Sequence, residues 1–142
     1  MTKDNPMTVV LIEDDKEDCC KFEKQAELQT NISIVGITGS SDEGLKIVKE
    51  KEPEAVILDL TPTSGSGIKF LEQLNQTALP FRPIIVVTSN NNAKSLSAQL
   101  AFLGIDWFFF KGQHDYSEEL VFDTLLTFRK RSGRILVNQN KV

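Results

Sequence analysis

Four apolar runs in this sequence end on side chains that could do chemistry together. Glu13 and Asp14 follow the first run, Asp59 follows another, and Thr88 and Lys111 follow two more. Carboxylates that meet at one place raise one another's pKa because like charges repel, and a hard divalent cation removes that conflict. A hydroxyl and an ammonium on the far side could hold the oxygens of a phosphoryl group. The set therefore predicts phosphoryl-transfer chemistry, provided that the fold brings its members to one edge.

Asp59 is the residue on which this prediction depends. It ends the apolar run Ala55–Leu58, but a lone aspartate after a strand is more often a helix cap or a loop residue. The other residues have ordinary explanations too. Glu13–Asp15 could be a solvated helix start, Thr88 a loop cap and Lys111 a solvated strand end. Only their conjunction, each at the carboxyl end of an expected strand, favours the functional interpretation.

Five short apolar runs predict the strands that would position these residues. They lie at 8–12, 32–37, 54–58, 84–87 and 105–110. Runs with little polar alternation are typical of strands that are buried on both faces of a parallel sheet. The segments between them carry apolar residues at helical spacing and predict helices around 19–26, 41–52, 68–74, 96–103 and 120–128.

The alternation of strands and helices indicates an α/β fold, in which helices cover both faces of a parallel sheet. Right-handed crossovers limit the possible arrangements. The expected solution is a five-stranded sheet in the flavodoxin-like order 2-1-3-4-5. This order puts the first and third strands side by side, so Glu13 and Asp14 would meet Asp59 at the carboxyl edge of the sheet.

Composition narrows the classes of function. The 142 residues suffice for one domain, which we place at 8–131 between a flexible lead-in at 1–7 and a tail at 132–142. The net charge of −4 argues against nucleic-acid binding, and no apolar run is long enough for a membrane span. The polar start has no signal core, so we expect a cytoplasmic protein. Cys19 and Cys20 do not suggest disulfides, and the single histidine, His114, makes a Cys/His zinc site improbable.

Five motifs in order resemble the receiver domains of two-component response regulators, and the resemblance covers 8–131. These motifs are the strand and acidic pair of 9–15, the strand 55–60 with Asp59, the glycine Gly67 eight residues later, the strand 84–89 with Thr88, and 104–111 with Lys111. The resemblance implies the flavodoxin-like fold described above. It also implies a signalling switch rather than an enzyme, one that takes part in its own phosphorylation and dephosphorylation.

The resemblance implies a role for each acidic residue. Asp59 would accept a phosphoryl group from a histidine kinase or a phosphotransfer protein. Magnesium would be held by Glu13, Asp14, Asp59 and the backbone carbonyl of Thr61.

The resemblance also implies how the signal leaves the site. Thr88 and Lys111 would bind the phosphoryl oxygens, and Thr88 and Phe108 would be the switch residues. The face made by the fourth helix, fifth strand and fifth helix would then bind an output protein that the sequence does not identify, or a second copy of the chain. We expect a single-domain regulator without a nucleic-acid or membrane partner.

The chain departs from the family pattern at three positions. Those at Gly112 and Pro62 favour an alternative, a pseudo-receiver that binds partners without phosphorylation, whereas the retained acids, Thr88 and Lys111 oppose it. Gly112 replaces the usual proline after the lysine, and Pro62 lies three rather than four residues after Asp59. Phe108 lacks the hydroxyl of the tyrosine often found there.

Two enzymes or cofactor binders with related folds fit less well. A flavodoxin-type cofactor site needs a phosphate-binding loop where this chain has Glu13–Asp15, which would repel phosphate. A haloacid-dehalogenase-type phosphatase needs a second acid two residues after its nucleophile, where this chain has Thr61.

Overall fold

The computed structural model describes residues 5–60, 66–90 and 97–132, and these form five strands that alternate with five helices. The elements are β1 (Met7–Ile12), α1 (Lys16–Gln29), β2 (Ile32–Thr38), α2 (Ser41–Lys51), β3 (Ala55–Asp59), α3 (Ser66–Asn75), β4 (Ile84–Ser89), α4 (Ser97–Phe102), β5 (Trp107–Phe110) and α5 (Glu118–Ser132). All strand pairs are parallel, and the order in the sheet is β2-β1-β3-β4-β5. The α/β fold and the strand order predicted from the sequence are therefore confirmed.

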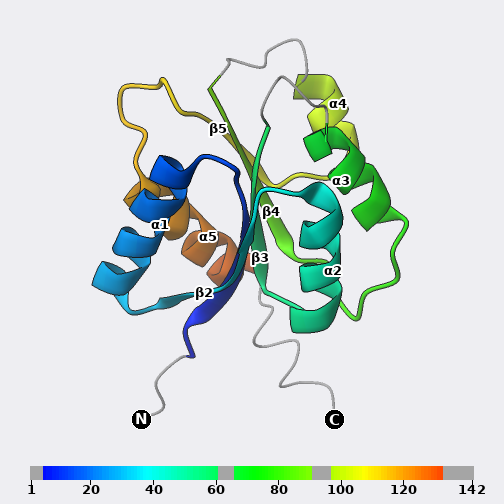
Figure 1. Cartoon of the computed structure of the whole chain (residues 1–142), viewed down its shortest axis with the longest axis horizontal. Coiled ribbons are helices and arrows are strands. Elements are labelled where there is room, and N and C mark those ends of the chain that lie inside the picture. Colours follow the sequence, from blue (N-terminus) through cyan, green and yellow to red (C-terminus); the bar gives the residue numbers. More distant parts are fainter. Residues whose placement is uncertain (1–4, 61–65, 91–96, 133–142) are drawn as a thin grey trace.

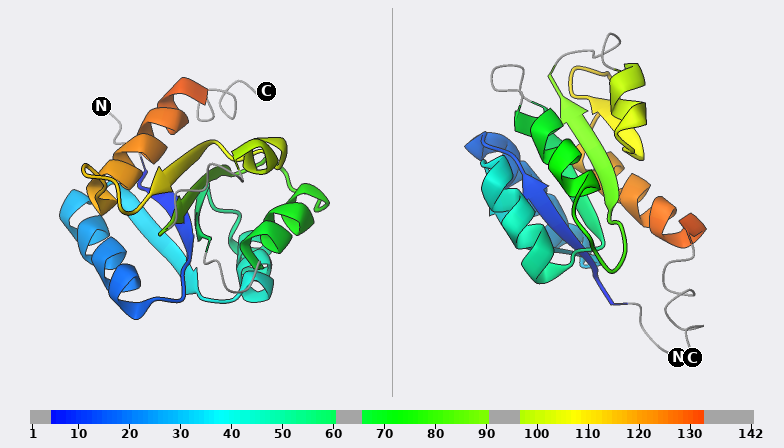
Figure 2. Two further views of the ribbon diagram at one scale, coloured as in Figure 1. Left: turned by 90° about the horizontal axis from the view of Figure 1, so that it is seen from above. Right: turned by 90° about the vertical axis from the view of Figure 1, so that its right-hand side faces the viewer.

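The helices cover the sheet in two layers. Figure 1 shows α1 and α5 on one face and α2, α3 and α4 on the other, and Figure 2 shows the same arrangement from two further sides. Because successive side chains of a strand point to opposite faces, the apolar strands contribute side chains to two separate hydrophobic cores, one on each face of the sheet. One, the α1/α5 core, contains Leu11, Phe22, Ile57, Val86, Phe109 and Phe122 among others. The other, the α2–α4 core, contains Ile12, Leu58, Phe70, Val87 and Leu100 among others.

Local signals in the sequence set the ends of several helices. Asp15 caps α1, and its carboxylate accepts a hydrogen bond from the backbone N–H of Asp18 at 3.0 Å. Ser40 caps α2 in the same way. Gly104 follows α4 with a φ of +83°, a conformation that glycine adopts without steric cost. Within the described ranges, none of these helices has the length and apolar content needed to cross a bilayer.

Three strands begin at residues other than those expected. β3 begins at Ala55, one residue later than expected. β1 begins at Met7, which is fully buried in the α1/α5 core, so this residue does not belong to the lead-in. β5 begins at Trp107, two residues later than expected. The reason lies in Asp106, whose carboxylate accepts a hydrogen bond from the backbone N–H of Ile85 at 2.8 Å. The side chain of Asp106 thus satisfies a main-chain donor at the start of β4.

Candidate functional site

The candidate site lies at the carboxyl edge of the sheet, where four strands end on polar residues. Each of these residues comes two positions after a member of the α1/α5 core: Glu13 after Leu11, Asp59 after Ile57, Thr88 after Val86 and Lys111 after Phe109. The period of two in a strand therefore directs all four side chains toward the same face of the sheet. Strand register brings them together, because β1 pairs with β3 and Asp59 lies opposite Thr88 on β4.

Three carboxylates converge at this edge as the sequence predicted. Oxygens of Glu13, Asp14 and Asp59 lie within 4.8 Å of one another. Glu13 is only 3% exposed and the Asp59 side chain 7%, whereas Asp14 is exposed. Oxygen ligands at this spacing, partly open to solvent, are a donor set that suits a hard divalent cation such as magnesium.

Lys111 reaches across the sheet to these acids. Its ammonium nitrogen Nζ lies 3.1 Å from Asp59 Oδ1 and donates a hydrogen bond to Glu13 Oε1 at 2.9 Å. It donates a second, shorter hydrogen bond to Asp18 Oδ2 at 2.7 Å. The lysine side chain is 8% exposed, so these ion pairs are shielded from water. Three carboxylates, those of Glu13, Asp18 and Asp59, thus share one ammonium, and the carboxylate of Asp14 lies close to those of Glu13 and Asp59.

Burial and the neighbouring charges shift the pKa values of Glu13 and Lys111. The pKa of Glu13 is raised to about 7, mainly by burial and in part by the nearby charge of Asp59, although the hydrogen bond from Lys111 opposes the shift. Burial would lower the pKa of Lys111, but its hydrogen bonds to Asp18 and Glu13 outweigh that effect and raise the pKa well above its usual range. The lysine therefore stays charged, while Glu13 is the group at this edge that burial most disfavours as an anion.

Thr88 lies beside Asp59 on the neighbouring strand. Its residue is fully buried, and its hydroxyl oxygen has no hydrogen-bond partner among the residues that the structure describes. A buried hydroxyl is normally hydrogen-bonded, so an unpaired one beside the carboxylate-bearing Asp59 is notable. This hydroxyl could donate to an oxygen placed on Asp59.

The aromatic position Phe108 lies away from the acids. It is half-buried and packs against the α2–α4 core, opposite Val87 of β4. Trp107, the preceding residue of β5, is 51% exposed, and Phe102 at the end of α4 is 90% exposed. Apolar surface is therefore available on the side of the molecule where α4, β5 and α5 meet.

The structure describes one of the two loops that depart from the family pattern, the loop with Gly112, but not the loop with Pro62. Thr61 and Pro62 lie outside the described residues, so the metal-binding carbonyl expected from Thr61 and the shifted proline stay predictions. Gly112 lies against the ring of Phe110: a Cβ atom there would come within 2.6 Å of the ring. The absence of proline after Lys111 thus makes room for a large aromatic side chain one residue before the lysine.

Sequence reasoning missed three residues at the site. Asp18 immediately precedes the helix predicted around 19–26, and nothing in the chain shows that it faces Lys111. Cys19 donates a hydrogen bond from its Sγ to the carbonyl oxygen of Glu13 at 3.3 Å, and burial raises its pKa to about 11. Gly39 packs so closely on Asp14 that a Cβ atom would lie 2.8 Å from the Cβ of Asp14. These contacts depend on tertiary structure and leave no local sequence signal.

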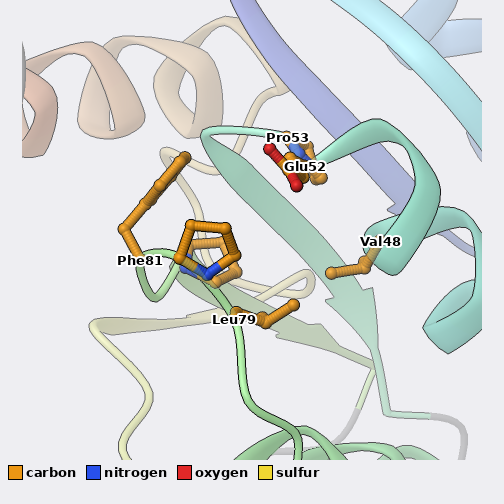
Figure 3. A pocket seen from close by; sticks show the side chains of 7 residues that line it. Val48, Glu52, Pro53, Leu79 and Phe81 are labelled. Carbon is orange, nitrogen blue, oxygen red and sulfur yellow. The ribbon is translucent and has the colours of Figure 1, made fainter.

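A pocket at the opposite, amino edge of the sheet is separate from this site (Figure 3). It is lined by Val48, Glu52, Pro53, Leu79, Pro80, Phe81 and Pro83. Glu52 is the one ionisable side chain in that lining, so the pocket offers little for acid–base or metal chemistry. The carboxyl edge is therefore the better candidate for the functional site.

Comparisons with known proteins support this choice. The family model described as the response regulator receiver domain matches residues 9–119. The chain is 28% identical over 107 residues to a protein of Halalkalibacterium halodurans named "Probable C4-dicarboxylate response regulator DctR", and this match covers 75% of the chain but 46% of that protein. The chain thus spans less than half the length of this curated relative.

Solved structures with low sequence identity share the fold. A response regulator receiver domain protein (CheY-like) from Methanospirillum hungatei JF-1 is similar with a TM-score of 0.76 at 12% identity, covering 92% of this chain and 98% of that one. The isolated REC domain of RcsB from Salmonella enterica serovar Typhimurium, determined with the phosphomimetic BeF3−, has a TM-score of 0.72 at 19% identity, with 87% and 90% covered. The family model, which matches residues 9–119, shows that the chain belongs to the response regulator receiver domain family of two-component systems.

Proposed function

We propose that this receiver domain is a phosphorylation-dependent switch in which Asp59 accepts a phosphoryl group from a histidine kinase or a phosphotransfer protein. The observation that carries the proposal is the convergence of Glu13, Asp14, Asp59 and Lys111 at one edge, with the carboxylate oxygens of the three acids within 4.8 Å. Such a set combines a nucleophile, ligands for a cation and a fixed positive charge, which phosphoryl transfer needs.

The acceptor step follows from this arrangement. A carboxylate oxygen of Asp59 forms a bond to phosphorus, and the phosphorus–nitrogen bond of the phosphohistidine donor breaks. The electron pair of that bond stays on the imidazole nitrogen, and the ring, which carries a proton on its other nitrogen, leaves as neutral imidazole. Lys111 and Thr88, which lie beside Asp59, would stabilise the negative charge on the transferred oxygens.

Magnesium would be held by Glu13, Asp14, Asp59 and the backbone carbonyl of Thr61, and when bound it would neutralise charge on the phosphoryl oxygens. The three carboxylates fit this role because their oxygens are close enough to share one ion. Their mutual repulsion, which contributes to the raised pKa of Glu13, is the cost that a cation would relieve.

The switch would act through the face made by α4, β5 and α5. Thr88 would move toward the phosphoryl group, and Phe108 would shift with the end of β4, which it pairs with through Val87. The receiver domain would pass the signal to an output protein, or would dimerise through the exposed apolar residues Phe102 and Trp107. We place this activity in the cytoplasm, with neither nucleic acid nor membrane as a partner.

Phosphoryl uptake tests the proposal directly. The full chain, incubated with acetyl phosphate and magnesium, should gain the mass of one phosphoryl group, and Asp59→Asn should abolish this gain. Asp123→Asn, which changes an exposed aspartate on α5, is the matched control and should still be labelled. Labelling of Asp59→Asn at the rate of the unsubstituted chain would refute Asp59 as the acceptor. Absence of labelling in every variant, from both acetyl phosphate and a set of kinases, would favour the phosphorylation-independent pseudo-receiver.

A further inference from the structure

The ammonium of Lys111 is held by an acid that does not belong to the expected metal site. Lysine has three N–H donors and no acceptor. One of them bonds Glu13 at 2.9 Å and another bonds Asp18 at 2.7 Å, whereas the contact with Asp59 is an ion pair at 3.1 Å. Two donors are thus directed at Glu13 and Asp18 in the unphosphorylated protein.

Asp18 is fixed in position although it is the most exposed of these three partners. Its side chain is 21% exposed, compared with 1% for Glu13 and 7% for Asp59. It lies in the first turn of α1, and its backbone N–H bonds the capping carboxylate of Asp15 at 3.0 Å. The helix cap therefore holds Asp18 where its carboxylate meets Lys111 from the α1 side of the site.

Asp18 also stands apart from the acids that could bind a cation. The carboxylates that lie within 4.8 Å of one another are those of Glu13, Asp14 and Asp59. Its effect on the site thus runs through Lys111. A negative charge in direct contact with the ammonium weakens the positive potential that any incoming phosphoryl oxygens would meet.

We propose that Asp18 is a positioning residue that competes with the phosphoryl group for Lys111 and thereby lowers the affinity of the site for that group. The inference rests on the proposed function of Asp59. In the unphosphorylated protein Asp18 keeps one N–H of the ammonium. When a phosphoryl group is present on Asp59, its oxygens take over this donor, and Asp18 turns to solvent, which its partial exposure allows.

Competition of this kind has a signature that a purely structural role lacks. Removing the charge of Asp18 reduces the negative potential at the edge, so magnesium alone should bind more weakly. It also frees a donor of Lys111, so a phosphoryl mimic should bind more tightly once magnesium is saturating. A residue that only supports the fold would weaken both interactions when it is replaced.

The test compares Asp18→Asn and Asp18→Ala with the unsubstituted full chain by calorimetry. Magnesium chloride is titrated first, and BeF3− is then titrated at saturating magnesium. We expect the dissociation constant for magnesium to rise about threefold, because one nearby charge is lost. We expect the dissociation constant for BeF3− to fall about tenfold in Asp18→Ala. It should fall less in Asp18→Asn, because the amide oxygen can still accept a hydrogen bond from Lys111.

Glu17→Gln is the matched control, because it removes an exposed acid from the same helical turn, and no contact joins Glu17 to Lys111 within the described part of the chain. It should leave BeF3− binding unchanged. Circular dichroism melting curves check that each variant is folded. If the unsubstituted chain binds BeF3− and both Asp18 variants bind it equally or more weakly, the competition is refuted while the proposed function stands. If none of the proteins binds BeF3−, both the proposed function and this inference are overturned.

Discussion

The two edges of the sheet each carry a buried network of charges, but the networks differ in balance. At the amino edge, Arg129 near the end of α5 faces Glu54: Nε lies 2.9 Å from Oε2, and Nη2 donates to Oε1 at 3.1 Å. The same guanidinium donates a hydrogen bond to the carbonyl oxygen of Asn5. The backbone N–H of Thr8 donates to Glu54 Oε1, and the hydroxyl oxygen of Thr8 accepts from the backbone N–H of Glu54. One positive charge meets one negative charge in a two-pronged geometry.

At the carboxyl edge, Lys111 faces Glu13, Asp18 and Asp59, with Asp14 beside them. This network has an excess of negative charge and an unpaired buried hydroxyl at Thr88 within the described residues. The balanced network suits a structural role, because every charge has its partner. The network with excess negative charge suits a binding site. A bound cation would reduce the repulsion among its carboxylates, and a phosphoryl group would give the hydroxyl of Thr88 a hydrogen-bond partner. The predictions below test this difference.

The largest effect on stability is expected at the amino edge. Arg129→Met removes the partner of Glu54 and leaves a carboxylate partly buried without its counter-charge, so the free energy of unfolding should fall by about 3–5 kcal/mol. Urea unfolding followed by circular dichroism measures the loss. Lys130→Met, at the exposed neighbouring position, should change it by less than about 0.5 kcal/mol. Equal losses in both variants would show that the network has no structural role.

The next effect concerns pH and belongs to the carboxyl edge. The pKa of Glu13 is about 7 in the folded chain, against a reference value of 4.5. The folded state therefore binds more protons than the unfolded state between these pH values, so its stability should be greatest at the low end and fall as pH rises through 7. The decrease should be at most about 3 kcal/mol.

Urea unfolding at a series of pH values, with EDTA present, measures this decrease. Glu13→Gln has no such group to titrate, so its stability should vary less with pH than that of the unsubstituted chain over the same range. Glu17→Gln, on the exposed side of α1, should keep the full pH dependence. An identical pH dependence in Glu13→Gln would show that Glu13 does not titrate with the raised pKa.

A smaller effect should come from magnesium. A ligand that binds only the folded state at ten times its dissociation constant stabilises that state by about 1.4 kcal/mol. We expect magnesium to raise the melting temperature of the unsubstituted chain and of Arg129→Met alike, because Arg129 pairs with Glu54 at the amino edge and the acidic cluster lies at the carboxyl edge. Asp14→Asn should lose most of this shift, since it removes the exposed carboxylate of the cluster. A full shift in Asp14→Asn would argue against binding at this edge.

The sequence predicted the carboxyl edge better than the amino edge, for a physical reason. Glu13, Asp59, Thr88 and Lys111 each end an apolar run, so strand period and strand order alone bring them together. By contrast, Arg129 lies in the last turn of a helix, where cations are common, and nothing local pairs it with Glu54, 75 residues away in the chain.

The same reason explains the errors within the site and the fold. Asp18 occupies a helix turn whose rotation about its axis is set by the packing of α1, which the apolar spacing of Cys19 and Phe22 specifies only roughly. The start of β5 was placed too early because the apolar Ile105 was counted as strand, whereas the side chain of Asp106 takes the place of a backbone partner for Ile85. Side-chain to backbone bonds of this kind cannot be read from hydrophobic periodicity.

The smallest effect on stability is expected away from both networks, at the exposed Phe102 of α4. Because this side chain is 90% exposed, Phe102→Ser should change the free energy of unfolding by less than about 0.5 kcal/mol. If the face made by α4, β5 and α5 mediates dimerisation, the same change should reduce self-association measured by sedimentation velocity in the presence of magnesium and BeF3−. Leu28→Ser replaces an exposed leucine on α1, across the sheet from α4, and should not reduce it (Figure 1). Equal association in Phe102→Ser and the unsubstituted chain would move the interface to another surface. That result would leave both charge networks as described, since neither depends on Phe102.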